Sequence, residues 1–177
     1  QQSTAYQIAS VVAVNGTNII SIAVASTPAV VPQGKMLQVV RATDSTTRST
    51  TSTSYSDTGL SVTITPTKND SAIILIATCL VILSSSTVND LRGYVTVTDN
   101  SNNMISGAQD VRLGPKDLTS SGSAEVWLSP TVMGYSTPAT TSATTYKTRF
   151  RANTVNASIT LQNTTQTAQL FAIEVSA

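Results

Sequence analysis

The 177-residue sequence contains no histidine, and its single cysteine, Cys79, lies inside an apolar stretch. The missing histidine removes the side chain that most often transfers protons near neutral pH. One cysteine allows no internal disulfide, and apolar neighbours predict that the Cys79 thiol fills part of the core. We therefore expect no enzymatic activity, no catalytic residues and no cofactor.

Charged residues are also scarce, at 11% of the chain, and ten Lys and Arg against nine Asp and Glu give a net charge of +1. Such a balance is too weak to drive nucleic-acid binding through counterion release. The longest apolar run, residues 72–83, is shorter than the roughly 20 residues that a membrane-spanning helix needs. These two absences predict that the protein has no nucleic-acid partner and does not insert into a membrane.

Hydroxyl side chains are abundant instead, with 30 Thr and 24 Ser among the 177 residues. Neutral hydroxyls keep a sheet surface wet without self-repulsion, which favours an extracellular or particle-surface protein. The sequence has no charged start followed by an apolar stretch, as a signal peptide would, and it opens with Gln1. We expect either a processed terminus or a piece of a longer product.

The periodicity along the chain is that of β-strands, because segments rich in Val, Ile, Thr and Tyr alternate with turn-forming clusters about every ten residues. Residues 60–64 alternate strictly, which places Leu60, Val62 and Ile64 on one face. The predicted strands are residues 36–42, 49–55, 60–65, 72–83, 91–98, 104–113, 124–135, 146–152, 158–162 and 168–175. We predict an all-β fold, an antiparallel β-sandwich of the jelly-roll type.

The first 35 residues form a separate predicted unit. The Asn15-Gly16 dipeptide is well suited to a tight hairpin turn between two apolar segments. Residues 26–34 contain Pro28, Pro32 and Gly34, which favour an extended connector. We therefore predict an N-terminal hairpin or arm over residues 1–35, followed by a β-sandwich domain over residues 36–177.

The run 73–83 is apolar on both faces of its predicted strand. Such a pattern indicates a central strand that is covered twice, or a strand that contacts a neighbouring subunit.

Three cations recur at every second position in the strand predicted for residues 146–152: Lys147, Arg149 and Arg151. In a strand they would form a row about 13 Å long on one face. Tyr146, Thr148 and Phe150 would project from the other face. The row is our candidate binding site for anionic sugars or an acidic protein surface, and the alternative is a solvated strand face that resists edge pairing.

Other candidate sites have simpler explanations. The segment Asp99–Asn103 resembles the start of a calcium loop, but Met104 stands where that loop requires glycine, so we predict a polar turn and no metal site. The residues around Gly59 predict a turn leading into the Leu60 strand. Trp127, the only tryptophan, lies among apolar residues, which favours core or interface packing over sugar stacking.

Several segments together resemble a module of tail-fibre and virion structural proteins in tailed bacteriophages, especially marine and cyanobacterial ones. The resemblance rests on Met-Leu-Gln-Val-Val-Arg-Ala-Thr at 36–43, on the ordered string from Ser49 through Pro66, on Leu-Arg-Gly at 91–93 and on the closing strand 168–175. It covers roughly residues 36–177. One departure is Ala72 after Ser71, where the module usually has a Ser-Lys pair.

This resemblance implies a β-sandwich exposed on a virion, a homotrimeric assembly and no catalytic residues to transfer. We expect a tail-fibre-type host-attachment module that recognises a cell-surface glycan or protein and binds other virion proteins through its N-terminal arm. The alternatives are a capsid decoration protein that stabilises the head and, third, a pilus or surface adhesin subunit.

Overall fold

The computed structural model describes residues 34–85, 90–105, 107–115 and 123–176. Twelve strands, and no helix, form within these ranges. Accordingly, the described part of the chain contains no helix with the length and apolar character needed for a membrane crossing. The predicted Asn15-Gly16 hairpin lies outside the described residues, and the domain boundary after residue 35 stays a prediction.

The strands, in chain order, have the following bounds. They are β1 (Met36–Asp44), β2 (Arg48–Thr50), β3 (Ser56–Ile64), β4 (Ala72–Thr78), β5 (Val81–Ser85), β6 (Gly93–Asp99), β7 (Val111–Leu113), β8 (Ala124–Leu128), β9 (Thr131–Ser136), β10 (Thr144–Ala152), β11 (Ala157–Leu161) and β12 (Ala168–Val175).

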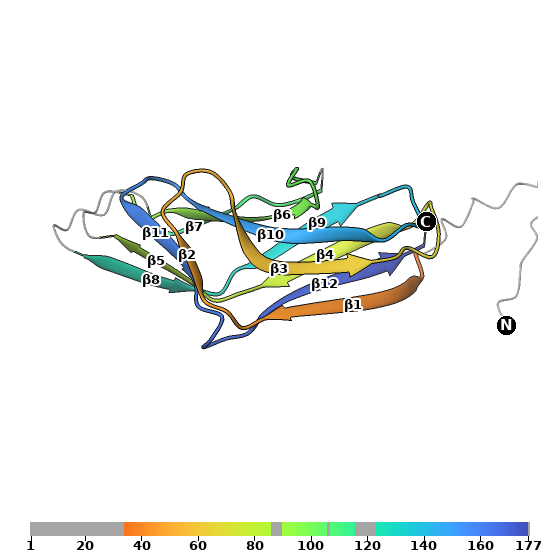
Figure 1. Ribbon diagram of the computed structural model, residues 1–177, viewed down its shortest axis with the longest axis horizontal. Coiled ribbons are helices and arrows are strands. Elements are labelled where there is room, and N and C mark those ends of the chain that lie inside the picture. The colour runs from red at the N-terminus through yellow and green to blue at the C-terminus, as the bar shows by residue number, and fades with distance from the viewer. Residues whose placement is uncertain (1–33, 86–89, 106, 116–122, 177) are drawn as a thin grey trace, which may run out of the picture. The chain divides into compact units, whose positions relative to one another are not determined.

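The strands form three four-stranded antiparallel sheets, with the orders β1-β12-β4-β9, β3-β10-β6-β7 and β2-β11-β5-β8 (Figure 1). The third sheet repeats the order of the first because four long strands pass from one into the other. Short breaks separate β1 from β2, β4 from β5, β8 from β9 and β11 from β12.

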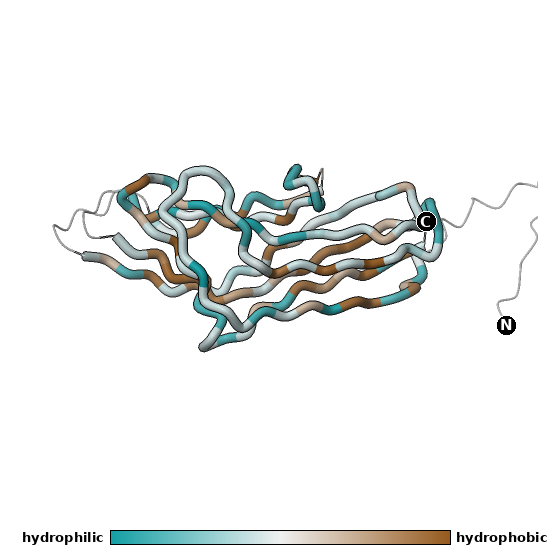
Figure 2. Tube along the Cα trace, viewed as in Figure 1, coloured by the Kyte–Doolittle hydropathy of each residue, from teal (hydrophilic) through white to brown (hydrophobic). Residues whose placement is uncertain are grey.

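When these four breaks are bridged, the described residues form eight strands in the sheet orders 1-8-3-6 and 2-7-4-5. This is the order of a jelly roll, in which antiparallel strands wind into two facing sheets. The prediction of an all-β antiparallel sandwich of this type is confirmed. Figure 2 shows hydrophobic residues concentrated along β4, β5 and β12.

The core lies between the facing sheets and follows the period-two pattern of the strands. Leu60, Val62 and Ile64 of β3 are each at most 3% exposed, as their alternation predicts. Tyr146 and Phe150 of β10 are each 1% exposed. The buried residues of the first and third sheets include Ile73, Leu75, Ala77, Val81, Leu83, Ile159, Leu161, Leu170 and Ala172. Burial of these apolar side chains is the main stabilising term of the fold.

The predicted turn before Leu60 is instead an irregular part of β3. Asp57 pairs with Arg149 and Ser61 pairs with Lys147, so three residues of β3 lie opposite one residue of β10. Gly59 takes a positive φ of 79°, and its N–H donates to the Asp57 carboxylate at 2.7 Å. The glycine therefore permits a bulge within a continuous strand.

Four predicted strands differ from those observed. The segment predicted at 49–55 pairs only over Arg48–Thr50, and the one predicted at 104–113 pairs as a strand only over Val111–Leu113. The long predicted strands 72–83 and 124–135 each break once, at residues 79–80 and 129–130. Both breaks lie where the first sheet passes into the third, so they result from the bending of a whole sheet.

Candidate functional site

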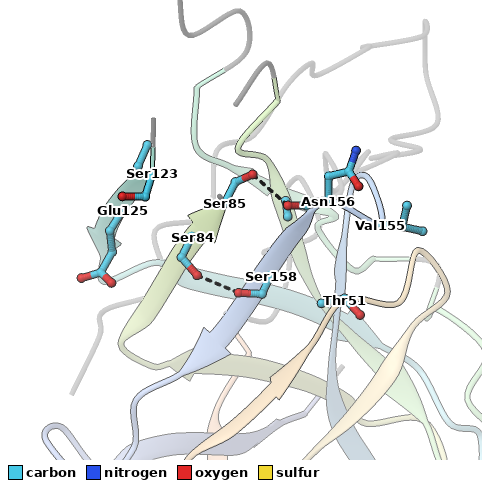
Figure 3. A pocket seen from close by; sticks show the side chains of 10 residues that line it. Thr51, Ser84, Ser85, Ser123, Glu125, Val155, Asn156 and Ser158 are labelled. Carbon is cyan, nitrogen blue, oxygen red and sulfur yellow. Dashed lines mark hydrogen bonds between the residues drawn. The ribbon is translucent and has the colours of Figure 1, made fainter. Parts of the chain in front are cut away.

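A hollow in the described surface lies on the third sheet, near the ends of β5, β8 and β11 (Figure 3). It has a volume of about 630 Å³ and is open to solvent. Its described lining consists mainly of small polar side chains: Thr51, Ser84, Ser85, Ser123, Ala124, Glu125, Val155, Asn156, Ala157 and Ser158. We call it the hydroxyl pocket.

Strand register brings the polar residues of the hydroxyl pocket together. Ser84 of β5 lies opposite Glu125 of β8 on one side and Ser158 of β11 on the other. The Ser84 and Ser158 hydroxyls share a 2.7 Å hydrogen bond, and the Ser85 hydroxyl donates to the Asn156 carbonyl at 2.8 Å. These contacts order the pocket wall, and the Ser84 and Ser158 hydroxyl oxygens keep further hydrogen-bonding capacity.

Trp127 lies beside this pocket on the same face of β8 as Glu125, two residues away. Its side chain is 53% exposed, and its indole N–H donates to the Glu125 carboxylate. The expectation that Trp127 packs in the core is therefore wrong for the described chain. Packing of Trp127 against a partner stays a prediction. Such a contact is compatible with the position of β8 at the edge of its sheet.

The described lining of the hydroxyl pocket is polar and carries little charge. Glu125 is the single carboxylate among its described lining residues, and that lining contains no Lys or Arg. Retaining or inverting glycosidases need two carboxyl groups about 5–10 Å apart, which this lining does not provide. Hydroxyl, amide and carboxylate groups suit a polar ligand that both donates and accepts hydrogen bonds.

The predicted cation row forms as expected on the outer face of β10. Lys147, Arg149 and Arg151 alternate with the buried side chains of Tyr146, Thr148 and Phe150. However, β10 lies between β3 and β6, so the row does not protect a sheet edge.

Each cation of this row already contacts other parts of the protein. The Lys147 ammonium donates to the Asn100 carbonyl at 2.9 Å, and Arg149 donates to the Tyr55 carbonyl. The Arg151 guanidinium lies 3.8 Å from the centre of the Tyr94 ring. These contacts give the row a structural role, and its binding of an external anion stays a prediction.

Arg151 belongs to a small cluster at the edge of this row. Its guanidinium lies 4.0 Å from the Asp110 carboxylate and 5.1 Å from the centre of the Tyr55 ring. The Tyr55 hydroxyl donates to Asp110. Burial and this hydrogen bond to Asp110 raise the pKa of Tyr55 to about 12. The phenol therefore stays protonated and holds Asp110 near Arg151.

The segment Asp99–Asn103 forms the predicted polar turn. The Asp99 carboxylate accepts from the Asn103 N–H at 2.9 Å, and Asn102 takes a positive φ of 69°. The Asp99 carboxylate oxygens thus close the turn. Within the described residues, no three His, Cys, Asp or Glu side chains lie close enough together to hold a metal ion.

A second distinctive surface lies on the outer side of the sheet β1-β12-β4-β9. Two adjacent cross-strand rows run over all four strands, one of Val39, Ile173, Ile74 and Tyr135, the other of Arg41, Phe171, Ile76 and Met133. Seven of these eight residues are apolar or aromatic, and Val39, Tyr135 and Met133 are 46–50% exposed. We call these two rows the apolar face.

The apolar face bears on the predicted role of the run 73–83. Within that run, Ile73 and Leu75 are buried in the core, whereas Ile74 and Ile76 point to the apolar face and stay partly exposed. A contiguous apolar surface of this kind is typical of a protein–protein contact. β4 is a central strand of its sheet, and subunit contact through its outer residues stays a prediction.

No protein-family model matches the chain, and no curated protein matches it.

Sequence reasoning missed the hydroxyl pocket altogether. Its residues come from segments near 51, 84, 125 and 157, and six of the ten are ordinary Ser, Thr or Asn residues within a hydroxyl-rich chain. The one available signal was Glu125-Val126-Trp127, which places an acid and an indole on the same face of a strand.

Proposed function

We propose that this protein is a non-enzymatic structural subunit on the surface of a bacteriophage particle, where it serves as a tail-fibre-type host-attachment module. The resemblance of residues 36–177 to virion structural modules supports the proposal. The jelly-roll fold is compatible with it, because such folds occur in viral capsid proteins and in lectins. Fold alone does not select a function, so the surfaces must carry the proposal.

The observation that carries it is the presence of two unlike outer surfaces on one sandwich. The apolar face suits burial against protein, whereas the hydroxyl pocket with Trp127 suits an external polar ligand. An attachment module requires both kinds of surface, one for assembly and one for recognition. We propose that copies of the chain pack through the apolar face in a homotrimer.

The apolar face suits self-assembly because it carries almost no charge. Arg41 is the single charged residue in its two rows, so burial against another copy would desolvate few charges. The same rows would be costly to leave in water on a free monomer.

The N-terminal arm is the proposed link to other virion proteins. Residues 1–34 contain no Asp, Glu, Lys or Arg, which suits an arm that becomes buried in a partner. An edge strand of the arm could add to a partner's sheet through main-chain hydrogen bonds. Removing residues 1–32 tests this link, because we expect the shortened protein to fold but to be missing from purified particles. Undiminished incorporation would contradict the role of the arm.

The alternative is a capsid decoration protein, and the apolar face is also compatible with it, since such a protein must clamp neighbouring capsid subunits. Immunogold labelling of intact particles separates the two: we expect label on the tail, and label on the head would favour decoration. Adsorption of the purified protein to host cells provides the second test. Host-specific adsorption supports attachment, and its absence favours decoration.

The third candidate, a pilus or surface adhesin subunit, also suits a hydroxyl-rich sandwich. It predicts that the protein is found on bacterial cells that carry no phage.

A further inference from the structure

The hydroxyl pocket and Trp127 point to a specific class of ligand. We propose that they form a carbohydrate-binding site for a neutral sugar unit, a hexose or an N-acetylhexosamine, within a glycan. This proposal deepens the attachment function and rests on it for the biological source of the glycan, but not for the chemistry of the site.

The first support is the way in which Trp127 is held. Half of its side-chain surface is open to solvent, while its indole N–H donates to Glu125. That hydrogen bond fixes the orientation of the ring, so little side-chain freedom is lost when a ligand packs on it. Indole faces are large and apolar, and they suit the C–H-rich face of a pyranose ring.

The second support is the position of polar groups next to this ring. Glu125 joins the two features, because its carboxylate accepts from Trp127 and also lines the hydroxyl pocket. Ser84 and Ser158 follow in the same cross-strand row. A sugar ring that stacks on Trp127 could therefore direct its hydroxyl groups toward acceptors and donors on the adjacent wall. The pocket volume of about 630 Å³ lies within the usual range of small-molecule sites, about 300–1,000 Å³.

The third support is electrostatic and selects among sugars. The described lining contains the Glu125 carboxylate and no cation, so a uronic acid, sialic acid or sugar phosphate would meet repulsion there. The cations of β10 do not change this, because they belong to a different sheet and contact Asn100, Tyr55 and Tyr94. Neutral sugars are therefore favoured over anionic ones.

The single tryptophan provides a direct reporter, since all indole fluorescence of the full chain comes from Trp127. The experiment begins with an array of neutral and anionic glycans probed with the full-length protein. Maltotriose, triacetylchitotriose and trigalacturonate are then titrated while Trp127 emission is recorded. We expect saturable binding of neutral glycans on the array, a change of Trp127 emission with at least one of the two neutral trisaccharides, and none with trigalacturonate.

Variants locate the binding at this site. Trp127→Ala should weaken binding of the best neutral glycan at least about tenfold by calorimetry, whereas Trp127→Phe should retain most of it. Glu125→Gln keeps the shape of the pocket and should weaken binding several-fold, which provides a second variant if Trp127→Ala fails to fold. Met104→Ala is the matched surface control, because Met104 is 45% exposed and does not line the hydroxyl pocket.

Three results would overturn the site: no neutral glycan bound anywhere on the array, a change of Trp127 emission with trigalacturonate as large as with the neutral trisaccharides, or unchanged affinity in both Trp127→Ala and Glu125→Gln. Failure of the site is distinguishable from failure of the proposed function. A chain found on the particle that binds no neutral glycan overturns the site alone. A chain that binds glycans through Trp127 but is absent from particles overturns the virion role alone.

Discussion

Gln38 and Glu174 are joined across the β1–β12 pair by a 2.6 Å hydrogen bond from the Gln38 amide to the Glu174 carboxylate. Glu174 is 0% exposed. Its other oxygen accepts from the Thr67 N–H at 2.8 Å and from the Thr67 hydroxyl at 2.9 Å. The carboxylate is thus stabilised inside the protein by neutral donors, which connect the end of the first sheet to the loop after β3.

This arrangement predicts a pH dependence of stability. Burial raises the pKa of Glu174, but the hydrogen bonds from Gln38 and Thr67 outweigh it and lower the pKa to about 2, from an ordinary value of 4.5. The stabilisation is therefore fully present above about pH 4.5 and is lost as the pH falls toward 2. In urea unfolding, Glu174→Gln should cost about 2 kcal/mol at pH 7 and progressively less below pH 4.5. A constant difference between the two proteins across this range would contradict the prediction.

Gly59 predicts a backbone effect. An added Cβ would lie 2.3 Å from the Arg48 guanidinium carbon, and the positive φ disfavours any side chain. Arg48 cannot move freely, because it pairs with Asp44 and donates to the Thr58 carbonyl at 2.8 Å. Gly59→Ala should therefore lower the free energy of unfolding by about 2 kcal/mol in urea denaturation. Ser61→Ala, at an exposed position of the same strand, is the control and should change stability by less than about 0.5 kcal/mol. Equal midpoints for the two variants would argue against the bulge.

The Cys79 thiol should be unreactive toward alkylating reagents in the folded protein. The thiol is 6% exposed, and burial raises its pKa to about 12. Since the thiolate is the reactive form, iodoacetamide at pH 8 should leave the native protein unmodified over hours. The same reagent should modify the guanidinium-unfolded chain completely, which provides the control. Mass spectrometry would detect rapid native labelling, the result that contradicts a buried thiol.

Arg151 tests whether the cation row is structural. Its guanidinium lies 3.8 Å from the centre of the Tyr94 ring, so Arg151→Gln should cost about 1 kcal/mol in thermal or urea unfolding. Arg151→Lys should retain part of this stability because it keeps the charge. If Arg151→Gln leaves stability unchanged but abolishes binding to an anionic polysaccharide, the row is a binding site and the structural role is wrong.

If copies of the chain pack through the apolar face, a charge introduced on that face should disrupt the oligomer. Val39 and Tyr135 occupy opposite edge strands of the sheet, and each is 50% exposed, so Val39→Glu and Tyr135→Glu should fold normally. Because an unpaired carboxylate is costly to bury, each variant should shift the protein from trimer to monomer in light scattering. Met104→Glu, at an exposed residue that bridges to β6 of the second sheet, should keep the trimer. A wild-type protein that is already monomeric would contradict the proposal.

Features that depend on residues close together in the chain could be predicted from the sequence, whereas features that depend on distant residues could not. The alternation of β3 and β10 identified the buried residues correctly, because side-chain direction in a strand depends on nearest neighbours alone. The buried thiol of Cys79 was predictable for the same reason, since its neighbours along the chain are apolar. Breaks in the long strands were not, because they result from the bend of four strands together.

The amino-acid sequence by itself determined that this protein is an all-β sandwich, because hydroxyl-rich and apolar positions alternate with the period of a strand. Only the tertiary structure decided what each exposed residue does. Register placed Glu125 beside Ser84 and Ser84 beside Ser158, left Trp127 at the surface, and supplied the cations of β10 with partners from other strands and loops. Those neighbours are far apart along the chain, so periodicity, which is a local property, carries no information about them.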